Sequence, residues 1–393
     1  MTPAYRGVAL GVFLAVAAAA SACAPSPSGS APPSATPSPS ASTAPSASAG
    51  PSASDGVTAR EGFWEPSGEA TTLAADLAAP WSVVPLGDDR ALVSERDSGT
   101  VREVGAGAAA RTVGVIPGVV AGGESGLHGL AVWEDAQAQA LWLYAYHGAA
   151  DDNRVVRMPL LGDPGELALG DPEAVFTGIP RASTHNGGRI AFGPDGYLYV
   201  TTGDAQNRDA PQDVAALGGK ILRLTPEGAP APDNPFGNAV WSLGHRNVQG
   251  IAWTADRGLW ASEFGQNTWD ELNHIVAGAN YGWPIVEGES DDDRFQNPVV
   301  VWTPSEASPS GVAAVGDTVF VTGLRGERLW MVDVTTDSAA RQPRAGLDGQ
   351  GRLRDVVAAP DGTLWILTGN TDGRGTPRAG DDILIRLPIA PAP

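Results

Sequence analysis

The stretch Arg189-Ile-Ala-Phe-Gly-Pro-Asp-Gly-Tyr-Leu-Tyr-Val-Thr-Thr-Gly203 decides the fold of this chain. Two apolar runs flank its Asp-Gly pair, and this arrangement indicates a β-hairpin because Asp-Gly suits the backbone angles of tight hairpin turns. The pattern recurs at 355–369 around a second Pro-Asp-Gly turn and at 250–265 around Asp256-Arg257-Gly258. A single hairpin unit therefore repeats along the chain.

Three weaker copies of the hairpin lie at 81–99, 129–148 and 311–323, which brings the number of copies to six. Measured between the aspartates of their turns, the copies are spaced 47, 60, 61, 61 and 44 residues apart. These aspartates are Asp88, Asp135, Asp195, Asp256, Asp317 and Asp361. The spacing is regular enough to suggest one structural unit per copy.

A third apolar segment follows each hairpin, and we expect an outer fourth strand in each intervening stretch. The third segments are 100–104, 154–160, 220–224, 271–276, 328–334 and 383–389. Four-stranded antiparallel units at this spacing, with almost no amphipathic helix between them, predict an all-β protein, a six-bladed β-propeller. A β-sandwich is the alternative, but its strands would not recur in such regular groups.

The N-terminal part differs in composition from the rest. Residues 1–22 have the apolar run and the small-residue ending of a secretory signal peptide, and the run is too short to span a bilayer. Cys23, the only cysteine, stands where a bacterial lipoprotein is cleaved and acylated; ordinary cleavage and secretion is the alternative. Residues 23–57, mostly Ala, Pro, Ser, Gly and Thr, predict a disordered linker. We expect the propeller over 58–393, outside the cytoplasm and held to the cell membrane by lipid, or secreted.

The net charge of −20 at pH 7 argues against binding to nucleic acid or to anionic lipid surfaces. We therefore expect membrane contact only through the N-terminal lipid. With one cysteine in the chain, no internal disulfide can stabilise the domain.

In a propeller the innermost strand of each blade lines a central channel, so the segments that lead into these strands meet at one rim. Here those segments are rich in His, Arg and amide side chains, and charged side chains are seldom buried without partners. Four arginines should converge there unpaired, which predicts an anionic ligand with several carboxylates or phosphates. They are Arg246, Arg325, Arg352 and Arg354. Pairing of each arginine with a local acid such as Asp204, Glu263 or Asp355 is the alternative.

His185 is the histidine that we single out. It lies in a Gly-rich segment at the expected rim, and its side chain should come within a few ångströms of Arg246 because both residues precede the innermost strands of successive blades. His245 is one residue off in the alternation of its strand and should face away. The other three histidines are explained by packing within blades.

Five motifs, in this order, resemble the soluble aldose (glucose/sorbosone) dehydrogenases that use pyrroloquinoline quinone, PQQ. The motifs are His185–Gly196, Leu217–Arg223, Leu243–Gly250, Asn280–Pro284 and Arg352–Val357. The resemblance spans about 80–387 and is closer to the broad-specificity aldose branch. It implies a six-bladed propeller with PQQ and Ca²⁺ at the axial rim, and oxidation of the anomeric hydroxyl of an aldose to a lactone.

The resemblance also implies roles for individual residues. His185 would be the general base, and Arg246 would polarise the quinone carbonyl that receives the electrons. The other cofactor-binding residues would be Asn247, Gln249, Arg325, Arg352 and Arg354, with the arginines pairing with the carboxylates of PQQ. The backbone carbonyls of Gly265 and Gln266 would bind Ca²⁺, and Glu124 and Gln206 are the candidates for substrate binding.

Four positions depart from the family pattern. Thr184 stands where glucose-oxidising members carry an acid, and Glu124 replaces a glutamine on the sugar side. Arg325 replaces a lysine, and Gln266 replaces a proline in the calcium loop, where backbone ligands tolerate the change. The first two departures bear on which sugar is oxidised, because contacts to sugar hydroxyls set specificity.

Two other function classes remain open. A Ca²⁺-dependent lactonase would need several carboxylate and amide ligands at the axis, and the cationic rim argues against it. The second class is a non-enzymatic extracellular propeller that only binds a ligand. The presence of both His185 and Arg246 favours an enzyme over such a binding protein. We expect a monomer that acts on a small aldose; the sequence does not identify the electron acceptor.

Overall fold

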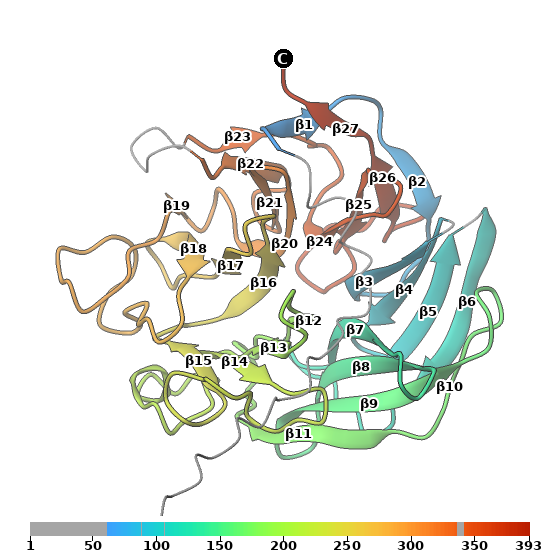
Figure 1. Cartoon of the computed structure of the whole chain (residues 1–393). Coiled ribbons are helices and arrows are strands. Elements are labelled where there is room, and N and C mark those ends of the chain that lie inside the picture. Colours follow the sequence, from blue (N-terminus) through green and yellow to red (C-terminus); the bar gives the residue numbers. More distant parts are fainter. Residues whose placement is uncertain (1–60, 88, 106, 336–341) are drawn as a thin grey trace, which may run out of the picture. The chain divides into compact units, whose positions relative to one another are not determined.

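The computed structural model describes residues 61–87, 89–105, 107–335 and 342–393. Within them six antiparallel sheets stand around a common axis, and the predicted six-bladed β-propeller is confirmed (Figure 1). The signal peptide, Cys23 and the linker lie outside the described residues, so those predictions stay predictions.

Each blade places its first strand innermost. Blade 1 consists of β3 (Pro80–Gly87), β4 (Arg90–Glu95), β5 (Thr100–Gly105) and β6 (Ala108–Val115). Blade 2 consists of β7 (Leu127–Asp135), β8 (Ala140–Gly148) and β9 (Asn153–Leu161), whose outer edge pairs with both β10 (Ala168–Leu169) and β11 (Glu173–Ile179). Blade 3 consists of β12 (Ile190–Phe192), β13 (Leu198–Thr201), β14 (Lys220–Leu224) and β15 (Val240–Leu243).

Blades 4 to 6 follow in the same order. Blade 4 consists of β16 (Val248–Trp253), β17 (Leu259–Glu263), β18 (Asp270–Ile275) and β19 (Val300–Trp302). Blade 5 consists of β20 (Pro309–Val315), β21 (Thr318–Gly323), β22 (Leu329–Asp333) and β23 (Arg344–Ala345). Blade 6 consists of β24 (Leu353–Ala358), β25 (Leu364–Thr368), β26 (Leu384–Leu387) and, from the other end of the chain, β2 (Thr71–Ala74).

The outer strand of blade 6 comes from the other end of the chain. It is β2, which pairs antiparallel with β26. After β26 the chain forms β27 (Ile389–Pro391), which pairs with β1 (Trp64–Pro66). The N-terminal strands therefore close the ring, since they pair with strands of the C-terminal segment.

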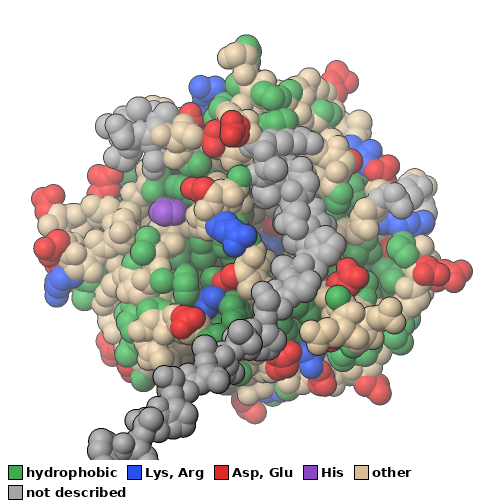
Figure 2. Space-filling model, in the orientation of Figure 1, with side chains coloured by type: hydrophobic (Ala, Val, Ile, Leu, Met, Phe, Trp, Pro, Cys, Tyr) green, Lys and Arg blue, Asp and Glu red, His purple; other side chains and the backbone are tan. Residues whose placement is uncertain are grey.

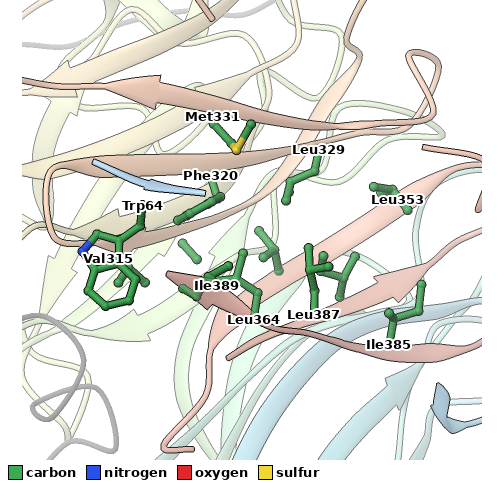
Figure 3. Close-up of a cluster of buried hydrophobic side chains, with 13 residues drawn as sticks. Trp64, Val315, Phe320, Leu329, Met331, Leu353, Leu364, Ile385, Leu387 and Ile389 are labelled. Atoms are coloured by element: carbon green, nitrogen blue, oxygen red, sulfur yellow. The ribbon is translucent and has the colours of Figure 1, made fainter. Parts of the chain in front are cut away.

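The core consists of apolar clusters packed between neighbouring blades. Figure 3 shows the cluster between blades 5 and 6, where Phe320 and Leu329 face Leu364 and Ile385, all nearly or completely buried. Trp64 joins this cluster, and its backbone N–H donates to Thr318 Oγ1 at 2.6 Å. Because truncation of such a buried aliphatic side chain costs about 2–5 kcal/mol, closure of the ring is held by packing as well as by strand pairing.

Candidate active site

A cavity of about 570 Å³ opens at the rim where the segments leading into the innermost strands converge. Six arginines line it: Arg96, Arg246, Arg325, Arg352, Arg354 and Arg374. Four acids share the lining: Glu124, Asp270, Glu327 and Asp372. The lining is thus more cationic than the chain as a whole, whose net charge is −20 and whose acidic side chains lie both at the edge and near the middle of the face in Figure 2. This composition suits an anionic ligand.

His185 lines this cavity from the segment before β12, and its backbone is left-handed with φ 59°. Few non-glycine residues adopt this region without support. The support comes from Glu124 Oε2, which accepts the His185 N–H at 2.9 Å, and from the Ala205 N–H, which donates to the His185 carbonyl at 3.1 Å. Gly187 follows with φ 60°, and a Cβ there would lie 2.6 Å from the Thr201 carbonyl oxygen. The local backbone therefore aims the imidazole into the cavity.

The two ring nitrogens of His185 have opposite partners. Nδ1 lies 2.7 Å from Asp204 Oδ1, and Nε2 lies 2.9 Å from Arg246 Nη2. A carboxylate only accepts and a guanidinium only donates, so the geometry assigns a neutral imidazole with its proton on Nδ1. The expected proximity of His185 and Arg246 is confirmed. Asp204 was not predicted as the partner of His185.

Asp204 is buried, and three side-chain or backbone donors surround it. Besides His185, the Gln206 N–H donates to Oδ1 at 2.8 Å and the indole of Trp283 donates to Oδ2 at 2.9 Å. Burial opposes ionisation, but the bonds from His185, Gln206 and Trp283 outweigh it, so the pKa of Asp204 lies below its ordinary value. Asp204 is thus an anion suited to hold and to stabilise a protonated imidazole.

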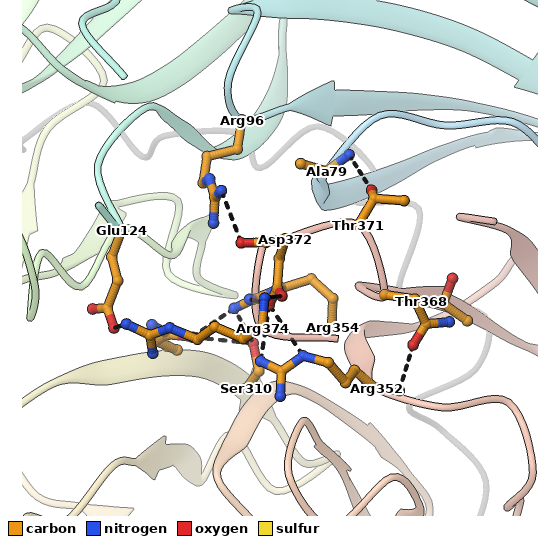
Figure 4. A network of polar contacts seen from close by, with 12 residues as sticks. Ala79, Arg96, Glu124, Ser310, Arg352, Arg354, Thr368, Thr371, Asp372 and Arg374 are labelled. Carbon is orange, nitrogen blue, oxygen red and sulfur yellow. Dashed lines mark hydrogen bonds and ion pairs between the residues drawn. The ribbon is translucent and has the colours of Figure 1, made fainter. Parts of the chain in front are cut away.

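Two of the four converging arginines correct the expectation that they are unpaired. Arg352 Nη2 lies 2.8 Å and Arg354 Nη2 3.1 Å from Asp372 Oδ2, so one carboxylate serves both guanidinium groups (Figure 4). The acids named as local partners bind elsewhere: Asp355 pairs with Arg189 at 2.7 Å. The loop between β25 and β26 carries Asp372 back to the axis, and no local pattern in the sequence indicates this.

The cationic groups are still incompletely satisfied. Among the described residues, the buried Nε atoms of Arg246 and Arg354 have no hydrogen-bond partner, and the exposed Arg325 side chain has no acidic partner. Burial lowers the pKa of Arg354 to about 10, although Asp372 opposes the shift. Two donors directed at no acceptor, beside an exposed third cation, favour a ligand that brings its own negative charge.

Asn247 and Gln249 present their donor groups to the cavity. Asn247 Oδ1 accepts the Gly187 N–H at 3.0 Å, and Gln249 Oε1 accepts from Arg354 Nη1 at 3.0 Å. Both residues line the cavity and both are buried. Since each acceptor oxygen is engaged, the NH₂ groups are what these side chains offer to a ligand.

Of the two candidates for substrate binding, Glu124 and Gln206, only the first lines the cavity. Glu124 lines the cavity, and its Oε1 pairs with Arg374 Nη2 at 2.7 Å across the mouth (Figure 4). Gln206 is exposed and does not line the cavity; its Nε2 donates to Thr184 Oγ1 at 2.8 Å. Thr184 does line the cavity, so Gln206 acts on it only through that hydroxyl.

The loop that holds Gly265 and Gln266 is wrapped around one carboxylate. Glu287 Oε1 accepts the N–H groups of residues 266–269 at 2.6, 3.0, 2.9 and 3.2 Å. Burial opposes ionisation, but these four bonds outweigh it and hold the pKa of Glu287 below its ordinary value. In a trans peptide the C=O points opposite to the next N–H, so the carbonyls of Gly265 and Gln266 point away from Glu287. This arrangement leaves two carbonyl oxygens for a cation.

The remaining histidines have structural surroundings. His245 is fully buried, bonded to Glu263 Oε2 at 2.8 Å and to Ser242 Oγ at 2.9 Å, and does not line the cavity, as predicted. His128 stacks on Trp81 with ring centroids 4.9 Å apart, and burial lowers its pKa to about 3.

Lys220 is a further residue that sequence reasoning did not assign. It is fully buried, and its Nζ donates to the carbonyls of Ala210, Pro211 and Gly218 at 2.6, 3.1 and 2.8 Å. These bonds hold the loop that connects β13 with β14 and that contains Asp204. Burial lowers the pKa of Lys220 to about 8. Its position after two glycines, at the start of β14, carried no signal of this role.

The part of the chain that the structure describes contains no helix with the length and hydrophobicity of a membrane span. Nor do three or more His, Cys, Asp or Glu side chains come together in that part so as to hold a metal ion.

Comparisons with known proteins agree with this geometry. The model of the family described as "Glucose / Sorbosone dehydrogenase" matches residues 77–385. The aldose sugar dehydrogenase YliI of Escherichia coli is 32% identical over 330 residues, which cover 75% of this chain and 88% of that protein.

Solved structures are similar over the same region. The PQQ-bound aldose sugar dehydrogenase of Streptomyces coelicolor is 47% identical, with a TM-score of 0.77, and the match covers 83% of this chain and 100% of that one. The apo form of the soluble aldose sugar dehydrogenase of Escherichia coli is 27% identical, with a TM-score of 0.69, and the match covers 82% and 99%.

Proposed function

The chain belongs to the glucose/sorbosone dehydrogenase family, and we propose on this basis that it is a quinoprotein that oxidises the anomeric hydroxyl of aldose sugars to lactones with PQQ as electron acceptor. One observation carries the proposal: a neutral His185, held between Asp204 and Arg246, at the mouth of a cationic cavity. The PQQ-bound aldose sugar dehydrogenase that this chain resembles also supports the proposal.

The residues of the chain divide the proton chemistry among them. His185 Nε2 accepts the proton of the anomeric hydroxyl, and the buried Asp204 carboxylate stabilises the resulting imidazolium through Nδ1–H. Arg246, which donates to Nε2 in this structure, keeps this nitrogen unprotonated until a substrate hydroxyl takes its place. When bound, PQQ supplies the quinone that receives the electrons of the C1–H bond.

The donor set of the cavity fits PQQ. The unpartnered Nε atoms of Arg246 and Arg354, the exposed Arg325 and the NH₂ groups of Asn247 and Gln249 are all hydrogen-bond donors. PQQ carries carboxylates and carbonyl oxygens, which are acceptors. We assign its carboxylates to Arg325, Arg352 and Arg354, and its remaining polar contacts to Arg246, Asn247 and Gln249.

We further propose that Ca²⁺ binds at the carbonyls of Gly265 and Gln266. The four N–H groups that converge on Glu287 support this, because they turn the carbonyl oxygens to the other side of the loop. Oxygen ligands are the ones that Ca²⁺ prefers, and a cation there would act as a Lewis acid beside the quinone.

For the substrate we propose a small aldose whose hydroxyls meet Glu124 and Thr184. Glu124 is charged and already paired with Arg374, so the sugar side of the cavity offers both an acceptor and a donor group. Gln206 takes part by orienting the Thr184 hydroxyl.

The location of the protein is also a proposal. Residues 1–22 would direct export, Cys23 would carry lipid, and residues 23–57 would tether a monomeric propeller, 58–393, outside the cytoplasm. The composition of those segments supports this. The electron acceptor would meet the protein in that compartment.

The test is to add PQQ and Ca²⁺, separately and together, to purified protein. We would measure melting temperature, and then screen aldoses with an artificial dye acceptor. We expect PQQ to raise the melting temperature by mass action, less at high salt, and an aldose to reduce the dye. Stabilisation without turnover would favour the binding propeller, and lactone hydrolysis dependent on Ca²⁺ alone would favour the lactonase; either result overturns the proposal.

A further inference from the structure

Trp283 contacts Asp204 and Arg246, the two side chains that bind the imidazole of His185. The residue is 5% exposed and belongs to the Asn280–Pro284 segment after β18. Its indole Nε1 donates to Asp204 Oδ2 at 2.9 Å, and the Arg246 guanidinium carbon lies 5.4 Å from its ring centroid. One side chain therefore contacts the partner of each imidazole nitrogen.

The contact with Asp204 fixes the orientation of the carboxylate. With Oδ2 held by the indole, Oδ1 is the oxygen left for His185 Nδ1 and for the Gln206 N–H. Without the indole N–H, the carboxylate could rotate about its last bond and turn its oxygens out of line with His185 Nδ1. A fixed Oδ1 keeps the imidazole proton on Nδ1, and hence keeps Nε2 free to act as a base.

The contact with Arg246 fixes the second partner. A guanidinium within about 6 Å of a tryptophan ring centroid is attracted to the face of the ring. This attraction holds Arg246, whose Nη1 also donates to the Phe264 carbonyl at 3.1 Å, so that Nη2 reaches His185. The guanidinium carbon of Arg208 lies 4.3 Å from the centroid of the same ring, and Arg208 Nη2 donates to the Pro284 carbonyl at 3.5 Å.

The main chain of Trp283 is anchored at both its N–H and its carbonyl group. The Trp283 N–H donates to the Gly244 carbonyl at 2.9 Å, and Gln212 Nε2 donates to the Trp283 carbonyl at 2.7 Å. Gly244 directly precedes His245 and Arg246 in the chain. Trp283 is therefore fixed relative to the segment that carries the arginine.

We propose that Trp283 is a positioning residue that sets the tautomer of His185 through Asp204 and the placement of Arg246 through its ring. The inference rests on the proposed function. Its two effects are separable, because Trp283→Phe removes the N–H and retains an aromatic face, whereas Trp283→Leu removes both. Trp365→Phe is the matched control, since Trp365 is buried in blade 6 and its Nε1 has no hydrogen-bond partner among the described residues.

The first readout needs no cofactor. Long-range ¹H–¹⁵N spectra of histidine-labelled apoprotein, with His185→Gln to assign the signals, report which nitrogen carries the proton. We expect the Nδ1–H form in the wild type and a mixture of both forms in Trp283→Leu, where Asp204 and Arg246 both lose their support. Trp283→Phe, which retains the aromatic face next to Arg246, should stay closer to the wild-type form. The control Trp365→Phe should retain the wild-type form. An unchanged tautomer in both Trp283 variants would overturn the proposal, whatever the catalytic activity proves to be.

The second readout separates the two roles in the loaded enzyme. Trp283→Phe should lower kcat by roughly 10- to 100-fold, the worth of one hydrogen bond to a charged group, and leave the dissociation constant of PQQ within about twofold of the wild type. Trp283→Leu should in addition weaken PQQ binding by roughly tenfold, because Arg246 loses its support.

The pH profile supplies a third readout. The charged groups that face the pair are Arg246 at Nε2, Asp204 at Nδ1 and Glu124 at the backbone N–H. Loss of a donor to Asp204 should move the acidic limb of kcat/KM in Trp283→Phe relative to Trp365→Phe. If Trp283→Phe only lowers the melting temperature, with kcat and pH profile as in the control, Trp283 is a packing residue and the inference is wrong. If the wild type oxidises no aldose, the proposed function fails while the tautomer result still stands.

Discussion

The imidazole Nε2 of His185 lies 2.9 Å from Nη2 of Arg246, although the two residues belong to successive blades. Because the guanidinium can only donate, this contact requires an unprotonated Nε2. The pair joins the expected base, His185, to Arg246, the residue expected to polarise the quinone. Replacement of His185 should therefore affect turnover, whereas replacement of Arg246 should also affect PQQ binding.

Replacement of His185 tests the base. His185→Gln should leave the fold and PQQ binding intact and lower kcat by roughly 10²- to 10⁴-fold, the usual contribution of a positioned general base. Steady-state kinetics with a dye acceptor and a PQQ titration measure both quantities. His274→Gln, at an exposed position on blade 4, is the control. Near-normal turnover in His185→Gln would remove the residue from the mechanism.

Replacement of Asp204 tests the pH dependence of stability. Its pKa is below the ordinary value in the folded protein, so its contribution to stability is present above the unfolded value of roughly 3.9 and is lost as pH falls through the folded value. Asp204→Asn should therefore melt earlier than the wild type at pH 7, and the difference should shrink below about pH 4. The exposed Asp209→Asn serves as control. A difference that is constant with pH would show that the charge of Asp204 contributes nothing.

Replacement of Asp372 tests the shared counter-charge. Asp372→Asn leaves Arg352 and Arg354, both buried, without their acid, and loss of one partner of a buried ion pair costs about 3–5 kcal/mol. The melting temperature of the apoprotein should fall, and PQQ should raise it by more than in the wild type because its carboxylates replace the missing charge. Thermal denaturation with and without PQQ measures this, with the exposed Asp291→Asn as control. Equal shifts with PQQ in both proteins would mean that PQQ does not reach these arginines.

Replacement of Glu287 tests the proposed calcium loop. Glu287→Gln weakens four hydrogen bonds from the backbone of residues 266–269, so the carbonyls of the loop should lose their orientation. We expect calcium affinity to fall by roughly 10- to 100-fold, as for other groups that support metal ligands. Calcium titration followed by calorimetry measures it, and Glu289→Gln, an exposed neighbour, is the control. Unchanged affinity in Glu287→Gln would place the ion elsewhere.

Replacement of Cys23 tests the anchor. Labelled palmitate should enter the wild-type protein in cells and should not enter Cys23→Ala, because the acyl chains are attached at that sulfur. Incorporation is measured on the purified protein after gel separation. Equal labelling of both proteins would contradict lipidation at Cys23 and leave secretion as the explanation of the N-terminal segment.

The fold and the place of the site could be predicted from the residue pattern alone. Hairpins are local features, two of them here have Asp-Gly turns, and six hairpins at regular spacing leave little freedom in how the strands pair. The same periodicity shows which residues precede the innermost strands, so the convergence of His185, Arg246 and Arg354 could be predicted before any coordinates were known. The resemblance supplied the chemistry.

The partners of the charged side chains at the axis could be read only from the folded ring. Asp204, Asp372 and Trp283 reach the axis from loops whose paths follow no periodicity, and the partners of a side chain depend on distances between such loops. For the same reason the four arginines were expected to be unpaired, and no pattern in the sequence indicated that β2 supplies the outer strand of blade 6. Strand pairing is encoded over a few neighbouring residues, whereas hydrogen bonds across the channel join residues that only the completed ring brings together.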